Sequence, residues 1–200
     1  MKSDKRARLL TKPGYSLPAT GPGSPLSKTS RGIIFPYSPN ITTQSSVDYN
    51  TYDTVHSNYQ QHAYARTRAP NLQVAAQFIN QTVDEAKYTA AAIHFLRVVT
   101  KMDFGADASR GTPPPVLNFS AYGAMNFQSV PVLVSSFTLA YPDDMDYIEF
   151  EVDGVGTTQL PVQMTIAIDL MPQYSPQRQN QFSVGALASG SLYKNNKGFI

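Results

Sequence analysis

Apolar and polar residues alternate along most of the chain, and this alternation predicts β-strands. Residues 72–79, LQVAAQFI, place every second side chain on one apolar face, which is the pattern of a half-buried strand. The more polar residues 44–66 fit one long or two short exposed strands. After residue 110, the segments VLNFSAY, VPVLVSSFTLAY and YIEFEV are separated by residues that favour turns. We therefore expect a mainly β (α+β) fold.

The clearest alternation lies in LPVQMTIAIDLM, residues 160–171. One face of this expected strand is apolar and the other is polar or small. The apolar face carries Val162, Met164, Ile166, Ile168 and Leu170, and the opposite face carries Gln163, Thr165, Ala167 and Asp169. The preceding dipeptide Asp153-Gly154 is typical of tight turns, so YIEFEV and this strand are expected to form a hairpin or near-hairpin.

One segment changes from period two to the period of a helix. Thr82 and Glu85 have the spacing of a capping box, in which two side chains satisfy free backbone donors at a helix start. Apolar side chains then follow at steps of three and four, and Gly105 favours a stop soon after them. These side chains are Tyr88, Ala92, Phe95, Val99 and Met102. We expect one helix over about residues 82–102, with this stripe packed on a sheet.

The N-terminal part differs in composition from the rest. Residues 1–31 carry seven basic residues and one acidic residue, a net charge of +6 within a chain whose total is +2. Six of the 15 prolines lie between residues 13 and 39, which argues against a helix or a central strand. We expect a basic, extended arm over residues 1–34 and a β domain over residues 35–200. The arm would either dock on an acidic partner or remain a solvated tail, and its docking residues would be Lys2, Lys5, Arg6, Arg8 and Lys12.

Most catalytic and metal-binding patterns are missing from the sequence. The chain has no cysteine, which excludes disulfides, thiolate metal sites and cysteine catalysis. His56 and His62 on one strand would lie about 20 Å apart, too far for one metal ion. The acidic segment from Asp143 to Asp153 lacks the spacing of an EF-hand loop. Glycine-rich phosphate and dinucleotide motifs and the GxSxG elbow are also absent. We expect no catalytic residue, metal or cofactor.

The composition of the chain indicates instead that its surface contacts other proteins. Charged residues make up only 15% of the chain, against about 25% in ordinary domains, and the chain has 12 Tyr and 10 Phe. Interfaces are depleted of charge and enriched in aromatic residues. No stretch approaches 18 uninterrupted apolar residues, and the basic N-terminus lacks the apolar core of a signal peptide. We expect neither membrane insertion nor export by a signal peptide.

The sequence TVDEAKYTAAAIHFLRVVTKMDFG, followed by GTPPPVLNFSAYG, resembles the tail-tube initiator and baseplate tube-junction proteins of contractile-tailed bacteriophages. The segments FPYSPNI, VPVLVSSFTLAYPDDMDYI, PVQMTIAIDLMPQYSP and the closing GFI occur in the order that this family shows. The resemblance covers roughly residues 33–200. It implies a tail-tube-like β-sandwich or barrel with one flanking helix. Several family members are longer and carry added domains.

The same resemblance implies a structural role in the virion. The chain would form a hexameric ring at the junction of baseplate and tail tube, after assembly in the host cytoplasm. Its partners would be the tail tube protein, an adjacent tube-like ring, baseplate hub proteins and the tape-measure protein. The family has no catalytic residues, so the chain is not expected to be an enzyme.

Phage DNA would pass through the bore of such a ring without specific binding. If residues 160–171 line that bore, Gln163, Thr165 and Asp169 would face the channel, where Asp169 would repel phosphates.

Three other interpretations stay open. The chain could be the tail tube protein itself in a simplified tail. It could instead be a monomeric β-sandwich that binds carbohydrate or another small ligand in an aromatic groove. An enzyme whose catalytic carboxylates lie between Asp143 and Asp153 is the third. Imaging of the purified chain separates them, because only the tube-like interpretations produce rings.

Overall fold

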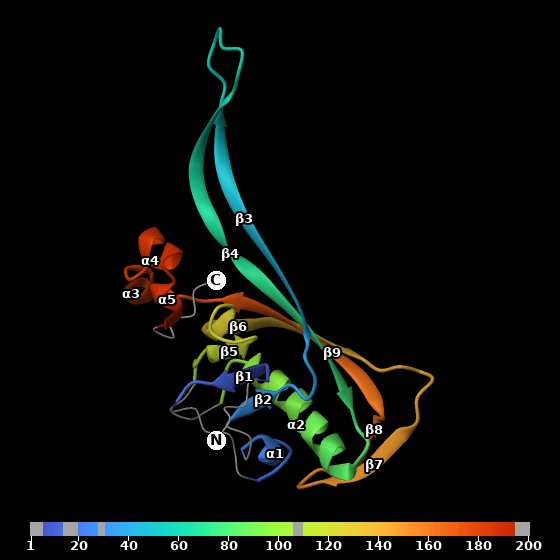
Figure 1. Ribbon diagram of the computed structural model, residues 1–200. Helices are drawn as coiled ribbons and strands as arrows, with labels where there is room; N and C mark the ends of the chain where they lie inside the picture. The colour runs from blue at the N-terminus through green and yellow to red at the C-terminus, as the bar shows by residue number, and fades with distance from the viewer. Residues whose placement is uncertain (1–5, 14–19, 28–30, 106–109, 195–200) are drawn as a thin grey trace.

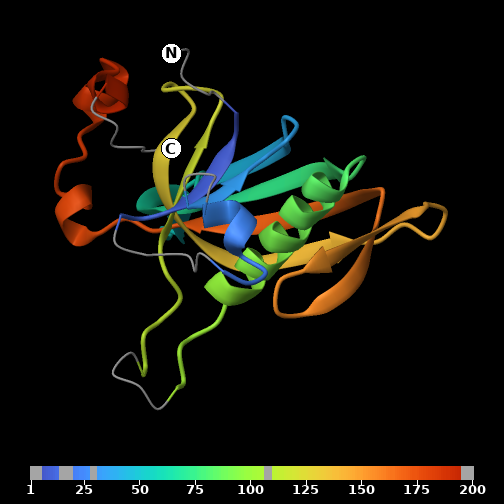
Figure 2. The same cartoon turned by 90° about the horizontal axis from the view of Figure 1, so that it is seen from below.

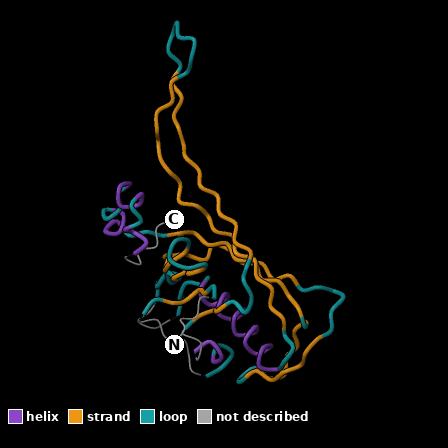
Figure 3. Tube along the Cα trace, viewed as in Figure 1, coloured by secondary structure: helices purple, strands orange, loops and turns teal. Residues whose placement is uncertain are grey.

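The structure is a computed structural model that describes residues 6–13, 20–27, 31–105 and 110–194 of the 200-residue chain (Figure 1). Strands make up 46% of the chain and helices 19%, which confirms the predicted mainly β, α+β fold. A long helix lies across a large antiparallel sheet. Several short helices and a separate two-stranded hairpin complete the described part (Figure 3).

The large sheet has seven strands in the order β2-β1-β5-β6-β9-β4-β3, and every neighbouring pair is antiparallel. Its strands are β1 (Arg8–Thr11), β2 (Gly32–Ile34), β3 (Asn40–Tyr52), β4 (Gln61–Ile79), β5 (Leu117–Ala121), β6 (Phe127–Ala140) and β9 (Gln163–Pro172). The second sheet contains only β7 (Tyr147–Val152) and β8 (Gly156–Pro161).

Helix α2 (Val83–Val99) packs on one face of the large sheet and closes the hydrophobic core (Figure 2). Its start is the predicted capping box, with Thr82 as N-cap and the Glu85 side chain returning to the Thr82 backbone. Ala92, Phe95 and Val99 are buried against core residues of the strands. The local signals for this helix were therefore sufficient to place it.

Two members of the predicted helix stripe differ from the other three. Tyr88 is half-buried, and its hydroxyl both accepts from the Ile34 N–H at 2.7 Å and donates to the Ile34 carbonyl at 2.8 Å. Met102 is 42% exposed, and its placement in the core stripe was wrong. Helix α2 ends at Val99, with Thr100 as its C-cap, so Met102 lies beyond the helical path.

The N-terminal segment is part of the sheet, so the predicted boundary at residue 34 was wrong. Strand β1 lies between β2 and β5, and Leu9 on it is 0% exposed. The short helix α1 (Ser24–Ser27) buries Leu26 under α2. Strand β1 itself, Arg8–Thr11, contains no proline or glycine, so these residues do not prevent its pairing.

The expected docking residues of the arm differ in their exposure to solvent. Arg6 and Lys12 are exposed, and Arg8 is half-buried on β1. Lys2 and Lys5 lie outside the described residues.

Strands β3 and β4 form a hairpin that extends well beyond the rest of the sheet (Figure 1). Its strands pair from Asn40–Ala75 out to Tyr52–Gln61, and residues 53–60 form the tip. Residues 44–66 therefore belong to two strands and their connection. Only the base of the hairpin, where β4 pairs with β9, contributes to the core.

The predicted turn at Asp153-Gly154 is present, but the strand that pairs with β7 across this turn is not the expected one. β7 pairs with β8, and the strand expected there, β9, pairs with β4 and β6 instead. Val162 separates β8 from β9. Its carbonyl accepts from the Asn80 N–H, and its N–H donates to the Asp146 carbonyl. After β9 the chain forms α3 (Pro176–Gln179), α4 (Val184–Ala188) and α5 (Ser191–Lys194).

Candidate assembly surface

The face of the sheet opposite α2 is polar. Along β9, Met164, Ile166 and Ile168 are buried beneath the helix, and the residues between them are only half-buried. Gln163, Thr165 and Asp169 therefore lie together on the face away from the core. Whether this face meets a channel stays a prediction.

Neighbouring strands extend the same face, because directly paired residues share one side of a sheet. Asp169 pairs with Gln73 on β4 and with Ser136 on β6, and Gln73 in turn pairs with Thr42 on β3. We call this surface the polar face. Its polar residues are Asn40, Thr42, Gln44, Asn71, Gln73, Gln77, Ser136, Thr138, Gln163, Thr165 and Asp169.

Sequence reasoning missed the residues of the polar face on β3, β4 and β6. The alternation of residues 72–79 marked Gln73 and Gln77 as facing away from the core. It did not show that they lie beside Asp169, because strand neighbours are separated by about ninety residues along the chain.

Charge is sparse on the polar face. Within residues 40–44, 71–79, 133–140 and 163–171, Asp169 is the one charged residue. The Ser136 hydroxyl donates to its carboxylate at 2.5 Å, and the Ser135 hydroxyl donates to its backbone carbonyl at 3.0 Å. The remaining side chains are mainly amides, hydroxyls and methyl groups, so this surface offers little for a phosphate chain to bind.

The projecting part of the hairpin carries a group of paired charges. Arg66 and Arg68 place their Nε atoms 3.0 and 2.9 Å from Oδ2 of Asp48. The hydrogen bond from Arg68 is the main cause that lowers the pKa of Asp48 below 3.8. Both arginines are solvent-exposed and Asp48 is only half-buried, so the ion pairs contribute little to stability.

Both lateral edges of four adjacent strands are unpaired among the described residues. β3 is the last strand of the sheet and pairs only with β4. On the other side, the backbone pairing between β5 and β6 ends at Val132, so residues 133–140 of β6 pair with β9 alone. We call β3, β4, β9 and residues 133–140 of β6 the four-strand layer. Unpaired strand edges are ready to pair with another chain.

The histidines and acidic residues considered from the sequence are not gathered into a site. His62 lies within 3.3 Å of the Thr51 hydroxyl, whereas His56 sits in the hairpin tip and His94 on α2. In the part of the chain that the structure describes, no three His, Asp or Glu side chains converge as metal ligands.

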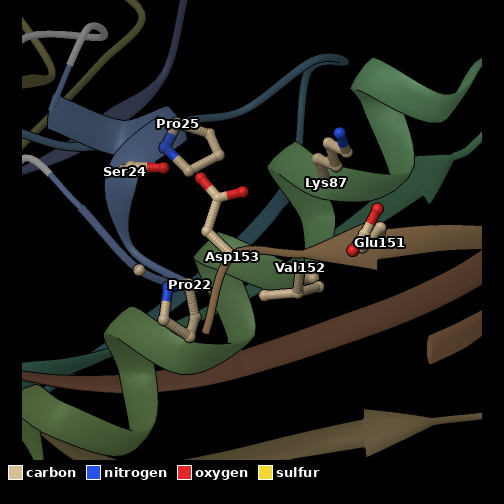
Figure 4. Close-up of a pocket in the computed structure, with 9 residues that line it drawn as sticks. Pro22, Ser24, Pro25, Lys87, Glu151, Val152 and Asp153 are labelled. Atoms are coloured by element: carbon tan, nitrogen blue, oxygen red, sulfur yellow. The ribbon is translucent and has the colours of Figure 1, made fainter. Parts of the chain in front are cut away.

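A small cleft lies where α1, α2 and the β7–β8 hairpin meet (Figure 4). Pro22, Pro25, Lys87, Glu151 and Asp153 are among its lining residues. Its volume of about 40 Å³ suits a water molecule rather than a substrate. We interpret it as a packing gap between elements.

Comparison with protein-family models and with curated proteins found no match for this chain. Within the described residues, no helix is long and apolar enough to cross a membrane.

Proposed function

We propose that this chain is a structural virion protein that forms a hexameric ring at the junction of baseplate and tail tube in a contractile phage tail. There it nucleates polymerisation of the tube and lines the channel. The resemblance of residues 33–200 to tube-junction proteins supports this role, and it alone supplies the number of six copies. One structural observation carries the proposal: the four-strand layer has an unpaired edge on each side.

Such a layer can close on copies of itself. Successive strands in it are antiparallel and their number is even, so β3 and β6 run in opposite directions. In a ring whose axis follows the strands, β3 of one copy therefore meets β6 of the next copy in the antiparallel sense. Ring closure of this kind satisfies the free backbone groups along the paired parts of β3 and β6.

The polar face is suited to line the bore of that ring. Helix α2 covers the other face, so closure with α2 outside leaves the polar face inside. Amides and hydroxyls neither bind phosphates by counterion release nor form an apolar wall. Asp169, repeated around the ring, adds weak repulsion of DNA. DNA and the tape-measure protein would then pass without sticking.

The hairpin of β3 and β4 provides a surface for neighbouring rings, the tail tube protein or hub proteins. It projects beyond the sheet, and most of its side chains are exposed (Figure 1). Tyr49 and Tyr64 form an edge-to-face pair with ring centroids 6.3 Å apart, and Tyr59 at the tip is 84% exposed. Exposed tyrosines of this kind are typical of protein interfaces.

Engineered disulfides test the edge pairing directly, since the chain has no cysteine of its own. Thr42→Cys or Gln44→Cys on β3 is combined with Ser136→Cys or Thr138→Cys on β6. Within one copy these positions are separated by β4 and β9, a spacing of about 14 Å. A disulfide needs Cα atoms about 4.4–6.8 Å apart, so only a neighbouring copy can supply the partner.

The variants are oxidised alone and with the neighbouring tail proteins, and separated by non-reducing electrophoresis. At least one of the four combinations is expected to give a ladder of covalent oligomers that ends at one closed size. Each single-cysteine variant is the matched control and gives at most a dimer. Rings seen by electron microscopy in which none of the four combinations cross-links would contradict the proposed edge pairing.

A further inference from the structure

A groove at the C-terminal end of α2 is lined mainly by apolar and basic side chains, with Asp103 as its one acidic lining residue. Its volume is about 740 Å³, and Asp103, Thr112, Pro113 and Pro115 form its other wall. Val98, Met102 and the prolines of this wall supply apolar surface. Val98 and Met102 are exposed in the single chain. The lining residues are His94, Arg97, Val98, Lys101, Met102, Asp103, Thr112, Pro113 and Pro115.

The opposite end of the molecule is acidic and carries exposed aromatic residues. The connection from β6 to β7 and the first residue of β7 have the sequence YPDDMDY, residues 141–147. Asp143, Asp144 and Asp146 are exposed in it, and Tyr141 and Tyr147 are 52% and 72% exposed. We call residues 141–147 the acidic segment. Glu149, Glu151 and Asp153 follow on the β7–β8 hairpin, so negative charge accumulates at this end.

The groove and the acidic segment cannot meet within one copy. The Asp146 carbonyl accepts from the Val162 N–H, and the Val162 carbonyl accepts from the Asn80 N–H, two residues before the N-cap of α2. The acidic segment therefore lies near the start of this helix, and the groove lies at its end. The 17 residues of α2 span about 26 Å. Figures 1 and 2 show the β7–β8 hairpin beside the N-terminal half of α2.

We propose that the groove is a docking site for the acidic segment of a second copy of this chain. Arg97 and Lys101 would face its aspartates, and Tyr141 and Tyr147 would cover the apolar surface of the groove. The positive charge of the groove complements the aspartates of the acidic segment, and its apolar surface suits the two tyrosines. A basic or wholly polar segment would lack one or both of these matches.

The direction of this contact is head to tail. Because the acidic segment and the groove lie near opposite ends of α2, a copy that docks in one groove leaves its own groove free for the next copy. The inference deepens the proposed function and rests on it: the partner of one ring would be another ring of the same chain. Edge pairing would close each ring, and the groove would join successive rings.

Two neutralised variants test the contact. The groove variant is Arg97→Gln with Lys101→Gln, and the segment variant is Asp143→Asn, Asp144→Asn and Asp146→Asn. All five side chains are exposed, so the substitutions leave the core intact. The control is Arg31→Gln, which removes a positive charge from an exposed position outside the groove.

Sedimentation velocity on the full chain at low and high salt measures the association. Each neutralised variant alone is expected to associate at least about tenfold more weakly than the control at low salt, with a smaller difference at high salt. A mixture of the two variants retains one intact contact, between the acidic segment of the groove variant and the groove of the segment variant. It is therefore expected to form pairs that do not grow further.

Association of the groove variant that equals the control, or a mixture whose components stay apart, would overturn the docking proposal. The disulfide test reports separately on the rings. Covalent rings that stack despite neutralisation would refute the groove contact and leave the ring intact. Salt-sensitive pairs without any ring cross-link would refute the ring and leave the groove contact standing.

Discussion

Replacing Leu9 by alanine tests whether the N-terminal strand belongs to the fold. Leu9 is 0% exposed and lies on β1, directly opposite Ile33 of β2 and Phe119 of β5, both of which are buried. The substitution removes the end of its side chain from the middle of three paired strands. Since β1 has a neighbour on each side, the backbone has little freedom to collapse into the space left behind.

The expected loss is large relative to the stability of a single domain. A buried leucine replaced by alanine costs about 3–5 kcal/mol, where the higher values belong to sites that cannot collapse. Domains are stable by about 5–15 kcal/mol, so this single change removes a substantial fraction. For a chain of this size, each kcal/mol lowers the melting temperature by about 2–4 °C, which gives a fall of about 6–20 °C.

Thermal and urea unfolding followed by far-UV circular dichroism measure the change, and Leu10→Ala is the matched control. Leu10 is the next residue of β1, is half-buried and points to the other face, so the same deletion there is expected to cost less than half as much. Equal effects at the two positions, or a neutral Leu9→Ala, would refute the placement of β1 in the sheet. The first 34 residues would then behave as the dispensable arm that their composition suggests.

Three further predictions concern other parts of the fold. Gly32→Ala is expected to destabilise the protein strongly in the same unfolding assay, because an added Cβ would overlap the backbone of Leu9 on the adjacent strand. Asn80→Ala is expected to cost about 1–3 kcal/mol by urea unfolding, because this buried side chain holds two hydrogen bonds whose partners would be left unpaired. The lowered pKa of Asp48 means that its ion pairs are fully present above the unfolded-state pKa and are lost as the pH falls through the folded-state pKa. In an NMR titration, Arg68→Gln is expected to raise that pKa toward 3.8, and a pKa that stays unchanged would contradict the assigned cause.

The sequence was sufficient where the determining contacts are local. The capping box that starts α2 involves residues three apart, and the apolar stripe of this helix repeats within each turn. The alternation along β9 likewise separated the residues beneath α2 from those on the polar face. Each of these signals is complete within a few neighbouring residues.

The N-terminal segment shows where composition misled. The high content of proline, glycine and basic residues over residues 1–34 indicated an extended arm. Four residues of this segment nevertheless form an interior strand, β1. Leu9 pairs with Ile33 and with Phe119, about 25 and 110 residues away. No local pattern in a four-residue strand reports partners at such distances.

The sequence by itself determined where α2 begins and which side of β9 is apolar, because those properties depend on the cap and the strand period of a continuous segment. Only the tertiary structure decided that β3 and β6 carry the free edges and that the groove and the acidic segment lie at opposite ends of α2. Strand neighbours and surface patches are assembled from segments far apart in the chain. Their positions follow from how the whole core closes rather than from the residues beside them.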